Sequence, residues 1–313
     1  MPICVYDIHP DGSATTPTDS DLTGPGVYRW WHFDLTEPGF ADWARGHIDP
    51  IPAAALLQSE TRPRCDRYDA GLILNLRGIN LNAGQPTEQM VSVRMWCAQD
   101  VIVTARVRRV FALDAIRQNI ADQNPPASVA AFLDDLVGRL TQRVQEEVLE
   151  IAETTGEFED SIAENHTDLP PDLGDVRRSV IKLRRYLEPQ RAALQKLATT
   201  DVPFLSDDDR LSLREIANRS TLAVEELDAL RDRMATLQDH HDTQAALQQG
   251  RNGYALSVVA AIFLPLGFLT GLFGVNVGGM PGISSDWAFL VLSLLMIAVA
   301  VLMVIFMRWM RWL

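Results

Sequence analysis

Two long stretches without a charged side chain lie near the C-terminal end of the sequence. The first runs from Tyr254 to Val275 and the second from Trp287 to Met307. A helix of about 20 residues crosses the roughly 30 Å hydrocarbon core of a bilayer, so each stretch is long enough to span a membrane. The segment between them, residues 276–286, is rich in glycine and contains a proline. These features predict a hairpin of two transmembrane helices (254–275 and 287–307) joined by a short loop.

The basic residues that flank the two stretches predict the orientation of this hairpin. Arg251 precedes the first stretch, and Arg308 and Arg311 follow the second, whereas the connecting segment contains no lysine or arginine. Positively charged flanks stay on the cytoplasmic side of a membrane. The first residues of the chain also lack the basic and apolar segments of a signal peptide. We therefore expect both termini to be cytoplasmic, including the tail over residues 308–313.

The composition of the chain disfavours several functional classes. A formal net charge of −13 is unsuited to binding nucleic acid, because such binding relies on lysine and arginine to neutralise phosphates. Three scattered cysteines form neither a disulfide framework nor a zinc knuckle. The sequence contains no GxxxxGKS/T phosphate loop and no nucleophile elbow. We therefore expect neither an enzyme, nor a permanently bound cofactor, nor a nucleic-acid partner.

The residues before the membrane stretches predict a cytoplasmic α/β domain over residues 1–200. Aromatic and β-branched residues are concentrated at 27–35, and apolar side chains alternate along 72–76, 91–97 and 101–107. Alternation with period two is the pattern of a strand, and the last two segments are close enough to form a hairpin. We expect a mixed sheet flanked by helices. The prolines of the first hundred residues are interpreted as breaks, namely Pro50, Pro52, Pro63 and Pro86.

Three long helices are predicted after the strands. Two prolines followed by a serine indicate the start of a helix that covers about 128–164, and a second helix is expected over 173–198. The third begins near Arg210 and meets no proline until Pro265. We therefore predict a stalk helix, residues 201–253, that continues into the first membrane span.

Eleven acidic residues and no basic residue lie between Arg143 and Arg177. This run is either a solvated helix face or a negative field that concentrates cations near a pore mouth. Its members are Glu146, Glu147, Glu150, Glu153, Glu157, Glu159, Asp160, Glu164, Asp168, Asp172 and Asp175.

The end of the first apolar stretch carries a recognisable motif. Residues 262–276 read IFLPLGFLTGLFGVN and are followed by VGGMPG. Together with two C-terminal spans and a short outer loop, this segment resembles the CorA-type family of divalent-cation transporters, in which Gly-Met-Asn closes the first span. The matching residues here are Gly274, Val275 and Asn276, and valine in place of methionine resembles the zinc-transporting branch of that family. The resemblance extends to WWHFDL (30–35), ETRPRC (60–65), LILNLRGINLN (72–82) and VSVRMW (91–96).

The resemblance implies a funnel-shaped homopentamer in the bacterial inner membrane that carries Zn²⁺, with other divalent cations and protons as further ions. The residues themselves require only that several copies assemble, because one hairpin cannot enclose an aqueous path. A ring of Asn276 carboxamides would accept hydrogen bonds from the water around a divalent cation. The alternative is that Asn276 only caps the end of the helix.

One face of the first span is expected to line this pore. Gly253, Leu256, Ala260, Leu264 and Gly267 recur at spacings of three and four residues, which places them on the same side of a helix. The resemblance implies that the two leucines form apolar constrictions that gate by dewetting. The alternative is close helix–helix packing, for which small residues at this spacing are typical in membranes.

A candidate zinc site lies shortly before the first span. Asp239, His240, His241 and Asp242 have side chains of the types that bind zinc. Adjacent residues of a helix point about 100° apart, so we expect such a site to need neighbouring copies of the chain. The alternative is an exposed polar helix turn. The two histidines and Asp286 are also candidates for proton-responsive groups.

Two other functions stay open from the sequence. A channel for magnesium, cobalt or nickel would have the same architecture. A membrane-tethered scaffold or signalling protein would use the long helix in a coiled coil, and it would not need an asparagine at the end of the span.

Overall fold

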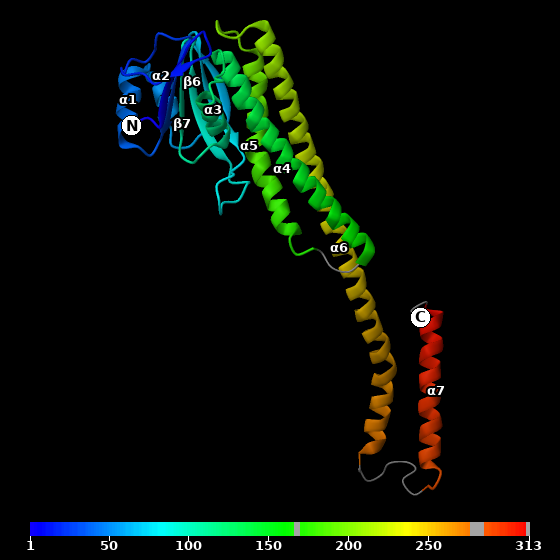
Figure 1. The fold of residues 1–313 in the computed structure, drawn as a ribbon. Helices are drawn as coiled ribbons and strands as arrows, with labels where there is room; N and C mark the ends of the chain where they lie inside the picture. The colour runs from blue at the N-terminus through cyan, green and yellow to red at the C-terminus, as the bar shows by residue number, and fades with distance from the viewer. Residues whose placement is uncertain (166–169, 276–284, 311–313) are drawn as a thin grey trace. The chain divides into compact units, whose positions relative to one another are not determined.

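The structure is a computed structural model that describes residues 1–165, 170–275 and 285–310. The chain divides into two compact units, Met1–Gln238 and Asp239–Leu313. The first unit contains a sheet and most of the helices, and the second contains the apolar C-terminal helices (Figure 1).

The first unit is built on a seven-stranded sheet with the order β2-β1-β3-β7-β6-β5-β4. Strands β3 and β7 are parallel, and the other neighbouring pairs are antiparallel. The predicted mixed sheet is therefore confirmed, as is the hairpin that β6 and β7 form. The strands are β1 (Cys4–Ile8), β2 (Ala14–Thr15), β3 (Tyr28–Asp34), β4 (Arg64–Tyr68), β5 (Gly71–Gly78), β6 (Val91–Cys97) and β7 (Val101–Arg106).

The three long helices begin close to their predicted positions. Ser128 caps the first, because its hydroxyl accepts a hydrogen bond from the Ala131 amide at 3.1 Å. Ser206 and Asp209 cap the third reciprocally, each accepting a hydrogen bond from the backbone amide of the other. The helices are α1 (Pro38–His47), α2 (Pro50–Leu57), α3 (Phe111–Ala121), α4 (Val129–Asn165), α5 (Leu173–Thr199), α6 (Asp207–Gly274) and α7 (Ala288–Trp309).

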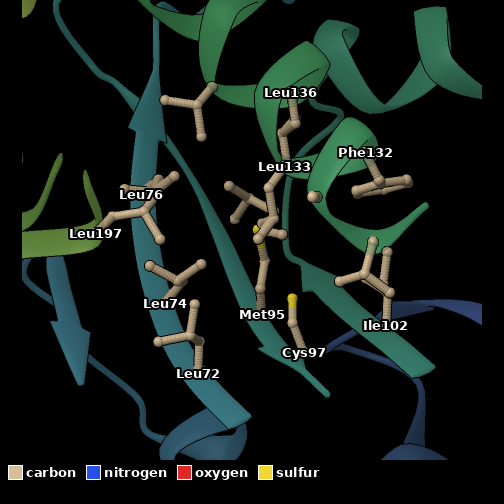
Figure 2. Close-up of a cluster of buried hydrophobic side chains, with 14 of the residues drawn as sticks. Leu72, Leu74, Leu76, Met95, Cys97, Ile102, Phe132, Leu133, Leu136 and Leu197 are labelled. Carbon is tan, nitrogen blue, oxygen red and sulfur yellow. The ribbon is translucent and has the colours of Figure 1, made fainter. Parts of the chain in front are cut away.

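Alternation along the strands gives the sheet two buried faces. One face packs against α3, α4 and α5, and Figure 2 shows leucines of β5 directed toward residues of α4 and α5. The residues of this cluster that Figure 2 labels are Leu72, Leu74, Leu76, Met95, Cys97, Ile102, Phe132, Leu133, Leu136 and Leu197. The opposite face packs against α1 and α2, through Trp31, Phe33, Val101, Val103, Phe40, Ala44 and Leu56 among others.

A third apolar cluster joins the three long helices beyond the sheet. It contains Val144 and Val148 of α4, Leu183 and Leu187 of α5, and Leu227 of α6. The apolar faces of these amphipathic helices are thereby buried within the first unit.

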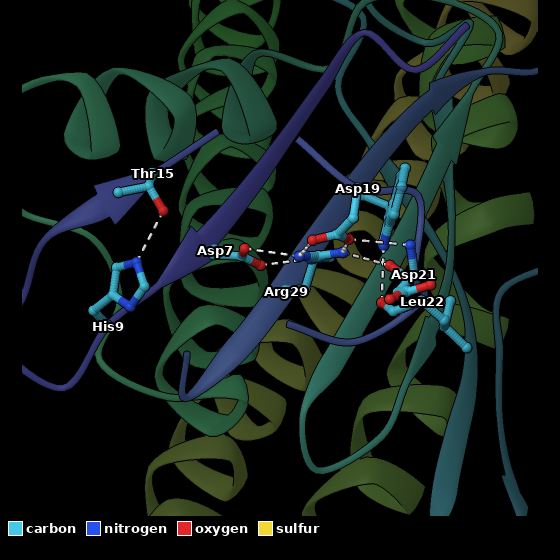
Figure 3. A network of polar contacts seen from close by, with 8 residues as sticks. Asp7, His9, Thr15, Asp19, Asp21, Leu22 and Arg29 are labelled. Carbon is cyan, nitrogen blue, oxygen red and sulfur yellow. Dashed lines mark hydrogen bonds and ion pairs between the residues drawn. The ribbon is translucent and has the colours of Figure 1, made fainter. Parts of the chain in front are cut away.

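A buried ion-pair network ties the first strand to the loop that precedes β3. The Arg29 side chain is fully buried, and its Nε and Nη2 donate to the two carboxylate oxygens of Asp7 at 2.5 and 2.8 Å. The same guanidinium donates to the Asp19 carboxylate and to the backbone carbonyl of Asp21. Figure 3 shows the three acidic residues gathered around this one cation.

Candidate functional site

The second unit presents long apolar helices whose most apolar segments are not buried by the described part of the chain. Both α7 and the apolar part of α6 are long and apolar enough to cross a membrane, and their most apolar segments are not buried. Exposed apolar surface of this extent is typical of a helix that faces lipid or other protein chains. Residues with half or more of their surface exposed include Leu256, Phe263, Leu264, Phe268, Phe289, Val291, Leu302 and Ile305.

The five residues proposed for a pore all lie in α6. Leu256 and Leu264 are each 71% exposed. A Cβ atom placed on Gly253 or Gly267 would meet nothing within 4 Å, so nothing in the described chain packs against these glycines. Ala260 is half-buried. Their spacing along the helix puts these residues on one face, which is open in a single copy.

The signature motif begins where the apolar helix ends. Gly274 is the last residue of α6, and Val275 follows it with 52% of its surface exposed. Asn276 lies outside the described residues.

The aspartates and histidines of the candidate zinc site lie in consecutive positions of α6. His241 Nδ1 is 3.5 Å from the Asp242 carboxylate, whereas Asp239 and His240 are exposed and form no contact with these two side chains in the described structure. In the described residues of this one chain, no group of three or more His, Cys, Asp or Glu is arranged to hold a metal ion. Asp286 is also exposed and lies just before α7.

The acidic run contributes to the packing of the first unit. Glu159 of α4 accepts two hydrogen bonds from Arg233 of α6, at 2.5 and 2.8 Å, and this pairing lowers the pKa of Glu159. Glu147 accepts a hydrogen bond from the Thr87 hydroxyl, and burial raises its pKa. Asp168, another member of the run, lies outside the described residues. Part of this negative charge therefore holds helices and loops together instead of facing solvent.

A basic cavity of the first unit was missed by the sequence analysis. It is lined by Arg77 of β5, Arg94 of β6 and Arg185 of α5, among others. The residues are far apart along the chain, so no local charge run reveals them. A usable signal was the presence of an arginine inside each of two mainly apolar strands, because a charged residue is seldom buried there without a partner.

The sequence comparisons agree with the architecture of both units. The family described as CorA-like Mg2+ transporter protein matches residues 25–308. A protein of Pectobacterium atrosepticum named Zinc transport protein ZntB is 32% identical over 295 residues, which cover 93% of this chain and 90% of that protein. A protein of the same name from Yersinia pseudotuberculosis is 30% identical over 313 residues, covering 99% and 96%.

Solved structures extend the comparison to three dimensions. The full-length CmaX protein superposes with a TM-score of 0.86 at 30% identity, covering 99% of this chain and 98% of its own. The ZntB cytoplasmic domain from Vibrio parahaemolyticus superposes with a TM-score of 0.69 at 23% identity, covering 78% of this chain and 98% of its own. The CorA magnesium transporter from Methanocaldococcus jannaschii gives 0.79 at 13% identity over 98% of each chain, which is a likeness of fold. The resemblance inferred from the motifs is confirmed, and the chain belongs to the CorA-like Mg2+ transporter family.

Proposed function

We propose that this chain transports zinc ions across the bacterial inner membrane through a pore formed by several copies. The observation that carries the proposal is the similarity, over more than nine-tenths of the chain, to curated relatives named Zinc transport protein ZntB. The two exposed apolar helices supply the membrane-spanning part that such an activity requires.

The proposed path follows the open face of α6. Identical copies, five by analogy with the family, place Leu256 and Leu264 around a common axis as two apolar constrictions. Gly274, Val275 and Asn276 form the outer mouth, where the carboxamide binds a hydrated cation through its water shell. A neutral ring holds a divalent ion less tightly than a carboxylate ring and so permits its release.

The proposed topology places both termini in the cytoplasm and the 276–286 loop outside. Residues 1–200 form the cytoplasmic domain, and residues 201–253 form the stalk that leads to the first span. The basic flanks of the spans support this orientation. The remaining acids of the α4–α5 run attract cations toward the cytoplasmic mouth.

The energy source is proposed to be a proton gradient. The sequence has no phosphate loop for ATP hydrolysis, and His240, His241 and Asp286 are the candidate proton carriers that flank the two spans.

The test is ion flux into proteoliposomes that contain the purified chain. Zn²⁺, Mg²⁺ and Co²⁺ are supplied separately at equal concentration, with and without a pH gradient. We expect Zn²⁺ flux to exceed the other two and to rise with the gradient. Flux of Mg²⁺ equal to or above that of Zn²⁺ contradicts the zinc assignment, and a rate independent of pH contradicts proton coupling.

A second candidate function is transport of magnesium by the same architecture. The description of the matching family favours it, since that description names Mg2+ as the transported ion. The flux experiment separates the two candidates directly.

A further inference from the structure

An open cavity of about 740 Å³ in the first unit has six basic side chains in its lining. It lies among the loop after α2, strands β5 and β6, and helix α5. Only two acidic side chains, Glu60 and Glu88, accompany the basic ones in the lining. Such a concentration of positive charge is unexpected in a chain whose net charge is −13. The six basic residues are Arg62, Arg77, Arg94, Arg108, Lys182 and Arg185.

The floor of the cavity contains two arginines on the same face of the sheet. In the β5–β6 register Asn75 pairs with Arg94, and Arg77 lies two residues further along β5, so both arginines point to one side. Arg94 is only 5% exposed. Burial lowers the pKa of both guanidinium groups, and the charge of Arg77 lowers that of Arg94 further.

Neither arginine has an acidic partner in the described part of the chain. Arg94 donates to the backbone carbonyls of Leu56 and Ser59 at 2.9 and 3.2 Å. Arg77 donates to the carbonyls of Thr61 and Met90 at 2.8 and 3.1 Å. The Arg94 Nε is buried and has no hydrogen-bond partner among the residues that the structure describes. Buried charges are normally paired, but Arg94, which is buried, and Arg77, which is half-buried, both lack a carboxylate that would offset their desolvation in the described residues.

The rim of the cavity adds further unpaired positive charge. Arg62 and Arg185 are exposed and form no ion pair with any carboxylate in the described residues, and Arg185 lies 5.8 Å from the Tyr186 ring. Arg108 donates a hydrogen bond to the Gln89 side-chain oxygen at 3.4 Å and forms no ion pair within the part of the chain that the structure describes. Lys182 is the exception, since it pairs with Glu88 at 3.2 Å.

A purely structural role explains only part of this arrangement. The two carbonyls that Arg94 contacts lie at and just beyond the C-terminal end of α2, so Arg94 fastens that helix end to the sheet. This role leaves the buried Nε without a function. It also does not account for the arginines that surround the opening without acidic partners.

We propose that this cavity binds a multivalent phosphate anion, namely the di- or triphosphate group of a soluble polyphosphate or nucleotide. Guanidinium groups bind phosphate oxygens through paired, charge-assisted hydrogen bonds, and several of them surround one volume here. The volume lies within the range of pockets that accept organic ligands of this size. The anion supplies the missing counter-charge, and the site lies in the first unit, separate from the proposed ion path.

The experiment uses the full-length chain in detergent and metal-free buffer, titrated calorimetrically with inorganic tripolyphosphate. We expect saturable binding to one site per chain that weakens as salt is raised. ATP forms the second arm: equal affinity assigns the site to the phosphate chain alone, and tighter binding assigns it to a nucleotide.

Two variants of rim residues and one matched control make the result specific. We expect R185Q and R62Q each to weaken tripolyphosphate binding about tenfold, the equivalent of one lost charge-assisted contact. The control R214Q removes the same charge from an exposed position of α6 outside the cavity and leaves the affinity unchanged. Circular dichroism spectra and elution volumes that match those of the parent chain verify folding.

Two outcomes overturn the proposal. One is the absence of saturable binding of either probe to the folded parent chain, including the case in which a neighbouring copy occupies the cavity. The other is an equal loss of affinity in R214Q and R185Q, because it would mean that binding follows overall charge instead of the cavity.

Discussion

At the level of single residues, this chain buries several charged and titratable groups whose partners lie on neighbouring strands or on the loop before β3. Arg29 is enclosed by Asp7, Asp19 and the Asp21 carbonyl, and these hydrogen bonds raise its pKa far above the ordinary value for arginine. His32 is buried, and its Nε2 accepts a hydrogen bond from the Arg106 Nε at 3.3 Å. Such groups make the stability of the first unit sensitive to single substitutions and to pH.

The Arg29 network gives a prediction for stability. D7N removes the bidentate carboxylate partner and leaves a buried cation with weaker acceptors. Breaking a buried ion pair from one side costs about 3 kcal/mol or more. We expect a lower apparent melting temperature, which is measured by the tryptophan fluorescence of the solubilised chain. D42N removes an exposed partner of Arg45 and should leave the melting temperature nearly unchanged, and equal effects of the two substitutions would argue against the network.

His32 gives a prediction for pH dependence. Burial lowers its pKa to about 4, the charges of Arg106 and Arg117 act in the same direction, and Asp114 opposes them. Its ring also contacts the Thr104 hydroxyl at 2.8 Å. The unfolded chain, with a histidine pKa near 6.5, therefore binds more protons below that pH. Stability is complete above about pH 6.5 and falls toward pH 4, by about 3 kcal/mol at most.

The measurement is the apparent melting temperature between pH 4.5 and 7.5. H32Q should flatten the acid side of this profile, because the variant has no group to protonate there. H47Q changes an exposed histidine and should leave the profile as it is. A parent profile that H32Q does not alter would assign the acid sensitivity to other groups.

At the level of secondary-structure elements, the caps and the periodicity carried most of the predictive information. The alternating segments became β5, β6 and β7, and the serine after the proline pair became the cap of α4. The prolines interpreted as breaks were partly misread. Pro50 and Pro52 lie in the first turn of α2, where proline is tolerated because the first amides of a helix have no partner within it.

Spatial arrangement was what the sequence could not predict. The pairing of the distant strands β3 and β7 depends on long-range packing, which no local pattern encodes. For the same reason Arg77, Arg94 and Arg185 come together only in the folded chain. The apolar face of α6 could be predicted because a helix has a fixed period. The four candidate zinc ligands could not be assigned in this way, because a metal site there depends on contacts that one copy does not provide in the described residues.

The cap of α6 gives a prediction at this level. S206A removes the hydroxyl that accepts from the Asp209 amide, and the loss of such a cap costs about 1 kcal/mol. We expect a small but measurable decrease in the urea midpoint of the first unit. S179A makes the same change inside α5, where the side chain has no hydrogen bond in the described structure, and should not decrease it.

At the level of the whole molecule, the exposed apolar surface and the proposed pore predict self-association. A single chain has a mass of 34.8 kDa. Light scattering of the detergent-solubilised protein, corrected for bound detergent, measures the mass of the assembly. We expect a whole-number multiple of the single-chain mass that is greater than one. A monomer at every concentration would contradict a pore that several copies form around a shared axis.

The proposed constriction can be tested within that assembly. L264S places a polar group where dewetting is proposed, so we expect a higher resting Zn²⁺ flux into proteoliposomes. V259S makes a comparable change about 140° away around the same helix and should leave the flux unchanged. N276A should abolish flux if the carboxamide ring receives the hydrated ion. Normal flux in N276A would leave this asparagine with only a helix-capping role.

The two edge strands of the sheet restrict how copies of the chain can associate. One margin, β2, is only two residues long, and the other, β4, carries Arg64, Asp66 and Arg67. Short or charged outer strands are poor templates for adding a strand from another chain. Copies of the chain are therefore not expected to associate by hydrogen bonding between the edges of their sheets. The surfaces of the helices then determine the stoichiometry of an assembly, and the protected sheet edges make fibrous aggregation unfavourable.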